Sequence, residues 1–104
     1  GESAMFNGPK GITVDSSGNI FVVESTNAIR KISQSGVVET FAGIPELSAL
    51  VDGVGLQARF VEPRGIAIDS NQNLYVVDYN VIRKISPEGE VSTLVGVTFS
   101  EDIV

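Results

Sequence analysis

The chain repeats itself: four short segments in its first half return in the same order in its second half. They are PKGITVD, GNIFVVE, AIRKIS and SGVVETFAG, which return as PRGIAID, QNLYVVD, VIRKIS and EGEVSTLVG. A tandem repeat of this length, made of short segments rich in branched residues, predicts a fold built by stacking one structural unit on the next.

Each repeat is predicted to contain four short strands. In the first repeat we expect them at Gly11–Asp15, Ile20–Glu24, Ile29–Ile32 and Val37–Ala42, and in the second at Gly65–Asp69, Leu74–Asp78, Ile82–Ile85 and Glu90–Val95. The first strand alternates branched with small residues, which favours a place where a neighbouring sheet comes close. The second strand is apolar on both faces and predicts a sheet covered on both sides, whereas the more polar fourth strand is expected at the outside.

Turn residues separate the predicted strands. Asp15 and Asp69 begin the first turn of each repeat. Gly18 is expected to take a left-handed conformation in the first repeat, and Gln72 or a neighbouring Asn in the second. Gly36 and Gly89 are expected in the hairpin between the third and fourth strands.

The connection between the repeats, residues 43–63, is long and contains glycine and proline. Ala58-Arg59-Phe60 within it matches Ala4-Met5-Phe6 before the first repeat. We predict a surface loop that ends in a short turn with Phe60 packed back onto the sheet, and no helix of useful length.

These features predict an all-β protein made of β-propeller blades, as two four-stranded antiparallel sheets. Residues 1–54 would form the first blade with its following loop, and residues 55–104 the second blade. The strand with small residues would lie nearest the propeller axis, where blades converge.

The order of the motifs resembles the NHL-repeat family of six-bladed propellers. The resemblance is carried by P-x-G-I-x-x-D, then G-N-x-x-V-V, then I-R-K-I-S and a strand that ends in glycine, and it covers almost the whole chain. Asp52-Gly53-Val54-Gly55, with Ala58 and Phe60, is similar to a D-G-x-G-x-x-A-x-F segment of many members. The Asn-His-Leu stretch that names the family is absent.

Two blades do not close a propeller, which typically needs about four to eight. Gly1 aligns with Gly55 and Val104 with Val51, so the chain spans two whole repeats. Two readings stay open. Copies could assemble head to tail around an axis, three chains giving six blades, or the chain could be a fragment of a longer propeller.

Composition narrows the chemistry that the chain can perform. Its 104 residues include no Cys and no His, which removes thiolate and imidazole metal sites and any catalytic His. The net charge of −6 disfavours binding to nucleic acid, and no apolar run reaches the ~20 residues of a membrane span. We assign no catalytic residue, no metal and no cofactor.

Three polar patterns have both a functional and a structural interpretation. Asp-x-Ser-x-Asn at Asp15 and Asp-x-Asn-x-Asn at Asp69 resemble the start of a calcium loop, but the later ligand positions differ, and a capped turn is favoured. The Arg-Lys pairs of the third strands could form a basic stripe for RNA. Pairing of Arg30 with Glu24 and of Arg83 with Asp78 across neighbouring strands, as structural ion pairs, is favoured instead.

One end of the blades is the predicted binding surface. The loops before the first strand and after the second strand contribute polar residues that differ between the repeats: Lys10, Ser25, Asn27, Arg64, Tyr79 and Asn80. We therefore predict a non-catalytic module for protein or glycan binding, or a blade pair that assembles into a closed propeller. The alternative is a metal-dependent hydrolase or lyase of the six-bladed type, with carboxylates such as Glu24 and Asp78 near the axis.

Overall fold

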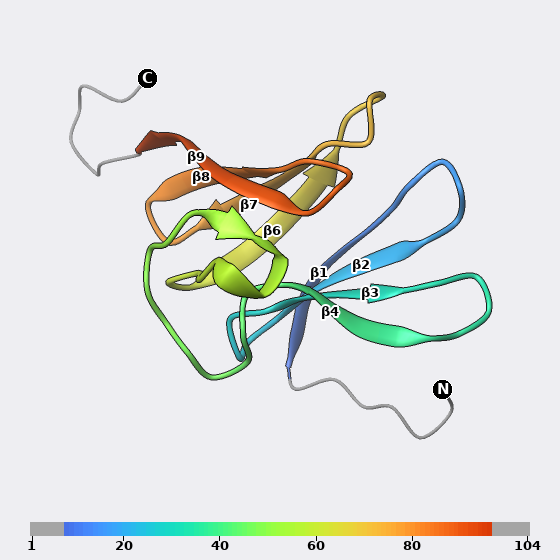
Figure 1. The fold of residues 1–104 in the computed structure, drawn as a ribbon, viewed down its shortest axis with the longest axis horizontal. Coiled ribbons are helices and arrows are strands. Elements are labelled where there is room, and N and C mark those ends of the chain that lie inside the picture. Colours follow the sequence, from blue (N-terminus) through green and yellow to red (C-terminus); the bar gives the residue numbers. More distant parts are fainter. Residues whose placement is uncertain (1–7, 97–104) are drawn as a thin grey trace.

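A computed structural model describes residues 8–96, and these form two antiparallel β-sheets that fan out from a common edge (Figure 1). Blade 1 consists of β1 (Pro9–Val14), β2 (Ile20–Glu24), β3 (Ile29–Ile32) and β4 (Val38–Ala42), in that order. Blade 2 has the order β5-β9-β8-β7-β6, made of β5 (Gly53–Val54), β6 (Pro63–Ile68), β7 (Leu74–Asp78), β8 (Val81–Ile85) and β9 (Glu90–Gly96). The all-β class and the blade architecture are confirmed.

The expectation of two four-stranded sheets is wrong for the second sheet. Gly53 and Val54, in the connection between the blades, pair with Val91 and Glu90 and add a fifth strand. A 3₁₀ turn at Gly55–Gln57 follows and is the helical element within residues 8–96. Phe60 lies beyond this turn and is fully buried, as predicted. The matched segment at residues 4–6 and the alignments of Gly1 and Val104 lie outside the described residues.

The turns follow the predicted chemistry. Gly18 and Gln72 occupy equivalent left-handed positions, with φ of 89° and 68°, and Gly36 and Gly89 have φ of 87° and 91°. Glycine takes this conformation without a steric penalty, whereas Gln72 does so at some cost. The side chain of Gln72 also accepts a hydrogen bond from the N–H of Ser16, at 2.7 Å, so it links the corresponding turns of the two blades.

Strand register divides each blade into two faces, because residues directly opposite each other on paired strands share a face. We call one face A; Ile12 pairs with Val22 on it and Ile66 pairs with Val76. Its apolar members are Ile12, Val14, Ile20, Val22 and Ile32 in blade 1, and Ile66, Ile68, Leu74, Val76 and Ile85 in blade 2. We call the opposite face B; it carries Gly11, Thr13, Phe21, Val23 and Lys31 in blade 1, and Gly65, Ala67, Tyr75, Val77 and Lys84 in blade 2.

The core lies between face B of blade 1 and face A of blade 2. Phe21 and Val23 from the first belong to one buried cluster with Leu74, Val76 and Ile85 from the second. The first strands of the two blades touch at Gly11, where an added Cβ would lie 2.9 Å from the carbonyl oxygen of Arg64. The small residue of the first strand therefore allows the close approach of sheets that the sequence predicted.

The other two faces have no sheet packed against them within residues 8–96. Face A of blade 1 leaves Ile12 65% exposed, and face B of blade 2 leaves Val77 47% exposed. The prediction that the second strand lies in a sheet covered on both sides therefore fails for both blades. Within residues 8–96, no sheet lies against face A of β2 or against face B of β7.

Candidate functional site

The six predicted binding residues lie at one end of the blades. Register pairs Pro9 with Glu24 and Pro63 with Asp78, so the starts of β1 and β6 stand beside the turns after β2 and β7. Backbone hydrogen bonds close this arrangement in each blade. The N–H of Ser25 donates to Gly8 O at 2.9 Å, and the N–H of Tyr79 donates to Glu62 O at 3.0 Å.

The two basic residues of the candidate surface lie on strands whose backbones approach each other. Lys10 and Arg64 precede the glycines at which β1 approaches β6, and both side chains are exposed. Arg64 forms an exposed ion pair of 3.4 Å with Glu62, an interaction worth little in water. Ser25 and Asn27 belong to the turn between β2 and β3 of blade 1. Tyr79 and Asn80 form the turn between β7 and β8 of blade 2, and we call these two turns the outer turns.

The two outer turns differ in length and backbone. Blade 1 uses three residues, Ser25–Asn27, with Asn27 at φ 76°, whereas blade 2 joins Asp78 directly to Val81 through Tyr79 and Asn80. Tyr79 has a φ of 56° and is 47% exposed. The first position of such a two-residue turn normally holds glycine, so an exposed aromatic residue there is strained. In the sequence, this conformation is indicated by the second repeat being one residue shorter than the first after Asp78.

A buried ion pair lies beneath the turn of blade 2. Arg83 Nη1 lies 2.9 Å from Asp78 Oδ2, and neither side chain is exposed to solvent. The carboxylate of Asp78 also accepts the N–H groups of Val61 and Glu62, at 3.1 and 2.7 Å. The pair therefore fixes the end of the connecting segment, just before β6, against the end of β7.

The connecting segment completes the surroundings of Arg83. Asp52 Oδ1 lies 3.0 Å from Arg83 Nη2, the carbonyl oxygens of Val51 and Arg59 accept from the guanidinium, and its Cζ lies 5.0 Å from the ring centroid of Phe60. Such stacking and multiple donation are characteristic of arginine. Asp52 was not among the predicted site residues, because its contact with Arg83 depends on how the connection folds.

The equivalent ion pair of blade 1 joins Arg30 to Glu24. Arg30 Nη1 lies 3.2 Å from Glu24 Oε1, which also accepts from the hydroxyl of Thr26 at 3.1 Å. The side chain of Arg30 is 21% exposed, while that of Glu24 is buried. Both carboxylates that the sequence offered for a metal are thus engaged by arginines.

The Arg-Lys pairs do not form one basic stripe. Neighbouring residues of a strand point to opposite faces, so Arg83 is buried on face A while Lys84 lies on face B. In blade 1, Lys31 Nζ lies 5.9 and 5.6 Å from the ring centroids of Phe21 and Phe41. The interpretation that Arg30 and Arg83 form structural ion pairs with Glu24 and Asp78 is therefore confirmed.

The aspartate turns lie at the opposite end of the blades. Asp15 Oδ1 accepts the N–H groups of Ser17 and Asn19 at 2.9 and 2.8 Å, and its second oxygen accepts from the Asn19 amide. Partial burial opposes the effect, but these hydrogen bonds and Lys31 hold the pKa of Asp15 below its usual value. The turns are thus capped as the structural interpretation expected, and residues 8–96 contain no cluster of three or more acidic metal ligands.

Asp69 repeats this arrangement with one addition. The N–H of Asn73 is the main cause that lowers the pKa of Asp69, and the Asn73 amide, the Tyr75 hydroxyl and the N–H of Asn71 contribute further. The Tyr75 hydroxyl donates to Asp69 Oδ2 at 2.9 Å, and this bond raises the pKa of Tyr75. The aspartates therefore act as turn caps at the end away from the candidate surface.

No helix in residues 8–96 has the length and apolar character needed to cross a membrane. The described part of the chain presents instead one polar loop end and two apolar sheet faces.

Known proteins share both the repeat and the fold. The chain is 36% identical to mouse (Mus musculus) Teneurin-4 over 100 residues and 35% identical to zebrafish (Danio rerio) Teneurin-3 over 101 residues. Each match covers 89% of this chain, which spans about 4% of the length of these relatives.

Solved structures with the same fold are about four times longer than the matched part. An auxiliary nutrient binding protein from Bacteroides thetaiotaomicron superimposes with a TM-score of 0.71 at 23% identity, over 82% of this chain and 25% of that chain. A virginiamycin B lyase from Staphylococcus aureus gives a TM-score of 0.63 at 19% identity, over 92% of this chain and 29% of that chain. At these identities the likeness shows the fold, which is that of β-propeller blades.

The family model described as Teneurin NHL domain matches twice in tandem, at residues 1–54 and again at 50–102. The two matches coincide with the two copies of the internal repeat, and the second extends over the whole of blade 2. The NHL resemblance of the sequence is thus confirmed, and the chain belongs to the Teneurin NHL domain family.

Proposed function

We propose that the chain is a non-catalytic binding module, which recognises a protein or a glycan through the loop end formed by Lys10, Ser25, Asn27, Arg64, Tyr79 and Asn80. The observation that carries the proposal is Tyr79. An exposed tyrosine at φ 56° occupies a turn position suited to glycine, with a strain of roughly 1–3 kcal/mol. Strain of this kind is retained where the side chain has a use, and tyrosine is among the residues that dominate binding energy.

The surroundings of Tyr79 support this role. The buried pair of Asp78 and Arg83 holds the base of the turn, so the ring is presented from a rigid support. Arg64, at the start of the strand beside it, offers exposed donors that suit carboxylate groups of a protein or hydroxyl groups of a glycan.

The alternative of a metal-dependent hydrolase or lyase has weaker support. The carboxylates considered for a metal, Glu24 and Asp78, are each paired with an arginine at 3.2 and 2.9 Å. The similarity to a virginiamycin B lyase stands at 19% identity and concerns the fold. Self-association into a closed propeller, with three chains giving six blades, belongs to the proposal because it would cover the two apolar faces.

The proposal is tested by separating binding from stability at Tyr79. The labelled chain is applied to arrays of purified proteins and purified glycans, and the affinity of each hit is then measured by surface plasmon resonance. Tyr79→Gly is expected to weaken binding at least about tenfold, because it removes an aromatic anchor. Its melting temperature should stay the same or rise, because glycine relieves the strained turn.

Glu88→Ala is the matched control, since Glu88 is exposed in a turn at the opposite end. Its binding should equal that of the unaltered chain. Binding that survives Tyr79→Gly, a loss that is equally large in Glu88→Ala, or arrays on which nothing binds would each refute the proposal.

A further inference from the structure

The connection between the blades contains an exposed apolar segment, Leu47–Val51. Leu47, Leu50 and Val51 are 49%, 50% and 42% exposed. Single exposed aliphatic residues are normal on a protein surface, but three within five consecutive residues form a patch. Because connections that run over a surface are usually polar, the patch calls for a physical explanation.

One edge of this segment is paired and the other is free. Isolated bridges at Ser48 and Val51 join it to residues 59–60, and the N–H groups of Ala49 and Val51 donate to carbonyl oxygens there, at 3.1 and 3.4 Å. The N–H groups of Ser48 and Leu50 have no acceptor within residues 8–96. Backbone groups of alternate residues in an extended segment point to opposite edges, so Ser48 and Leu50 share the free edge. Unpaired N–H and C=O groups along an exposed edge are a template for pairing with another chain.

Both ends of the segment are anchored. Before it, the N–H of Glu46 donates to the carbonyl oxygen of Thr26 in blade 1, at 2.6 Å. After it, the carboxylate of Asp52 lies 3.0 Å from Arg83 and accepts from the hydroxyl of Thr93 at 2.9 Å, both in blade 2. The free edge thus lies at the junction of the two blades, and not on face A of blade 1 or face B of blade 2. An edge that is already fixed loses little conformational entropy when it binds.

Negative charge flanks the free edge on both sides. Glu46 is exposed, has a φ of 72° and forms no ion pair within residues 8–96. This left-handed conformation is strained for glutamate, and such strain is retained where a side chain has a use. At the other end, Asp52 and Asp78 share the single charge of Arg83, which leaves one negative charge in excess. Arg59, the basic residue of the connection, donates from Nη1 to carbonyl oxygens at the 3₁₀ turn. The edge therefore suits a partner with basic side chains.

We propose that this edge binds an extended, basic and apolar peptide segment of a partner protein by β-strand addition. The peptide pairs with the main chain at Ser48 and Leu50, and its alternate apolar side chains contact the three aliphatic side chains of the segment. Its basic residues lie near Glu46 and Asp52. The occupant is a protein, because a glycan has no regular row of amide donors and carbonyl acceptors. The inference goes beyond the proposed function, because none of these residues belongs to the proposed binding surface.

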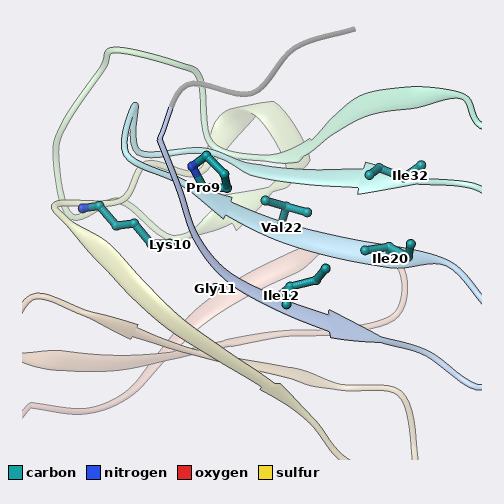
Figure 2. A pocket seen from close by; sticks show the side chains of 7 residues that line it. All are labelled: Pro9, Lys10, Gly11, Ile12, Ile20, Val22 and Ile32. Atoms are coloured by element: carbon teal, nitrogen blue, oxygen red, sulfur yellow. The ribbon is translucent and has the colours of Figure 1, made fainter. Parts of the chain in front are cut away.

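The groove on face A of blade 1 suits such a peptide less well. It measures about 400 Å³, and the apolar side chains of Ile12, Ile20, Val22 and Ile32 line it (Figure 2). The strand β2 beneath it pairs with β1 on one side and with β3 on the other, so its main chain has no free edge. The groove offers apolar contact without main-chain pairing, and a variant in it therefore serves as a control.

The test begins with a library of labelled peptides. Each has about six residues, is acetylated and amidated at its ends, and alternates valine or isoleucine with lysine or threonine. Fluorescence anisotropy with the unaltered chain identifies the peptide that binds most tightly. N-methylation of this peptide at one set of alternate residues should weaken binding at least about tenfold, because it removes the donors that face the edge. N-methylation at the other set should leave the affinity unchanged.

Variants of the chain then locate the site. Leu50→Pro removes a donor of the free edge but keeps an apolar side chain, and it should weaken binding at least about fivefold. Ile12→Asp, in the groove, should leave binding unchanged. Glu46→Gln should weaken it about twofold, whereas Glu88→Gln removes the same charge from an exposed turn and should have no effect. Circular dichroism verifies that each variant is folded.

Three results would overturn the inference. They are a library in which no peptide binds, N-methylation that has the same effect at both sets of positions, and a loss of binding in Ile12→Asp, which would locate the peptide in the groove. The N-methylation result stands even if Leu50→Pro does not fold, because it uses the unaltered chain. None of these measurements involves Tyr79, so this inference and the proposed function can fail separately.

Discussion

The two blades have matching residues at matching positions, yet they place them in different environments. Ile12 of blade 1 is 65% exposed, while its counterpart Ile66 packs against the core. Arg30 is 21% exposed, whereas Arg83 is completely buried beneath the connecting segment. The difference arises because face A of blade 2 packs against blade 1, and because the connecting segment between the blades (the linker) lies along the outer strand of blade 2. Burial in a repeat protein is thus set by the neighbour of a unit as much as by the unit itself.

The largest difference is expected at the two arginines. Arg83→Met should lower the free energy of unfolding by about 3–5 kcal/mol, because it leaves the buried charge of Asp78 without its partner. Arg30→Met should lower it by about 1–2 kcal/mol, since the side chain of Arg30 is 21% exposed and so partly solvated in the folded chain. Urea denaturation of both variants measures the comparison. Equal losses would show that the linker contributes nothing to the role of Arg83.

The paired glycines give the next largest difference. Gly11→Ala should lower the free energy of unfolding by about 1–3 kcal/mol, because the new methyl group meets the Arg64 backbone. Gly65→Ala should be neutral or stabilise the dilute chain by up to about 1 kcal/mol, because its methyl group enters open space and alanine is less flexible when unfolded. Thermal melts at low micromolar concentration make the measurement, and a loss at Gly65 as large as that at Gly11 would contradict the open surroundings of Gly65.

The turns capped by Asp15 and Asp69 should make the two blades contribute differently to stability at acidic pH. Since the pKa of each carboxyl is lower in the folded chain, their stabilisation is complete above the unfolded value of about 3.9 and is lost as the pH falls through the folded value. Asp69→Asn should therefore reduce the drop in melting temperature between pH 5 and pH 2. Asp15→Asn should reduce it less, because Asp15 lacks the tyrosine donor. Melting curves measured between pH 5 and pH 2 test this prediction, and an unchanged pH dependence in both variants would contradict it.

The smallest effect is expected from Tyr75→Phe, which gives blade 2 the residue that blade 1 has at Phe21. The pKa of Tyr75 is raised in the folded chain, so its contribution is complete below about pH 10 and is lost as the pH rises through the folded value. The variant should lose a little stability at pH 7 and show a weaker decline above pH 10. A decline as steep as that of the unaltered chain would assign the alkaline sensitivity to another group.

Local pattern was enough to predict most of the strands. The alternation of apolar and small residues, with glycine or aspartate between the segments, located the strands to within one or two residues. The approach of another sheet to Gly11 also followed from local sequence, because a strand that alternates branched and small residues has few other uses.

The features that sequence reasoning missed depend on contacts between distant segments. The strand β5 has two residues in a glycine-containing loop, and it exists because β9 offers an edge. The contact of Asp52 with Arg83 joins residues from the linker and from β8. The candidate surface was predicted by the differences between the repeats, but the strained turn at Tyr79 required the backbone geometry.

The short strand β5 has a consequence for how such chains grow. A bare outer strand offers unpaired N–H and C=O groups to any passing chain and is a recognised starting point for aggregation. In blade 2 the linker that leads into the blade is laid along β9 at Gly53 and Val54 and occupies part of that edge. A duplication that copies a blade together with its preceding linker therefore adds a blade whose outer edge is already partly paired. The number of blades can then increase without exposing an edge that pairs with strands of other chains.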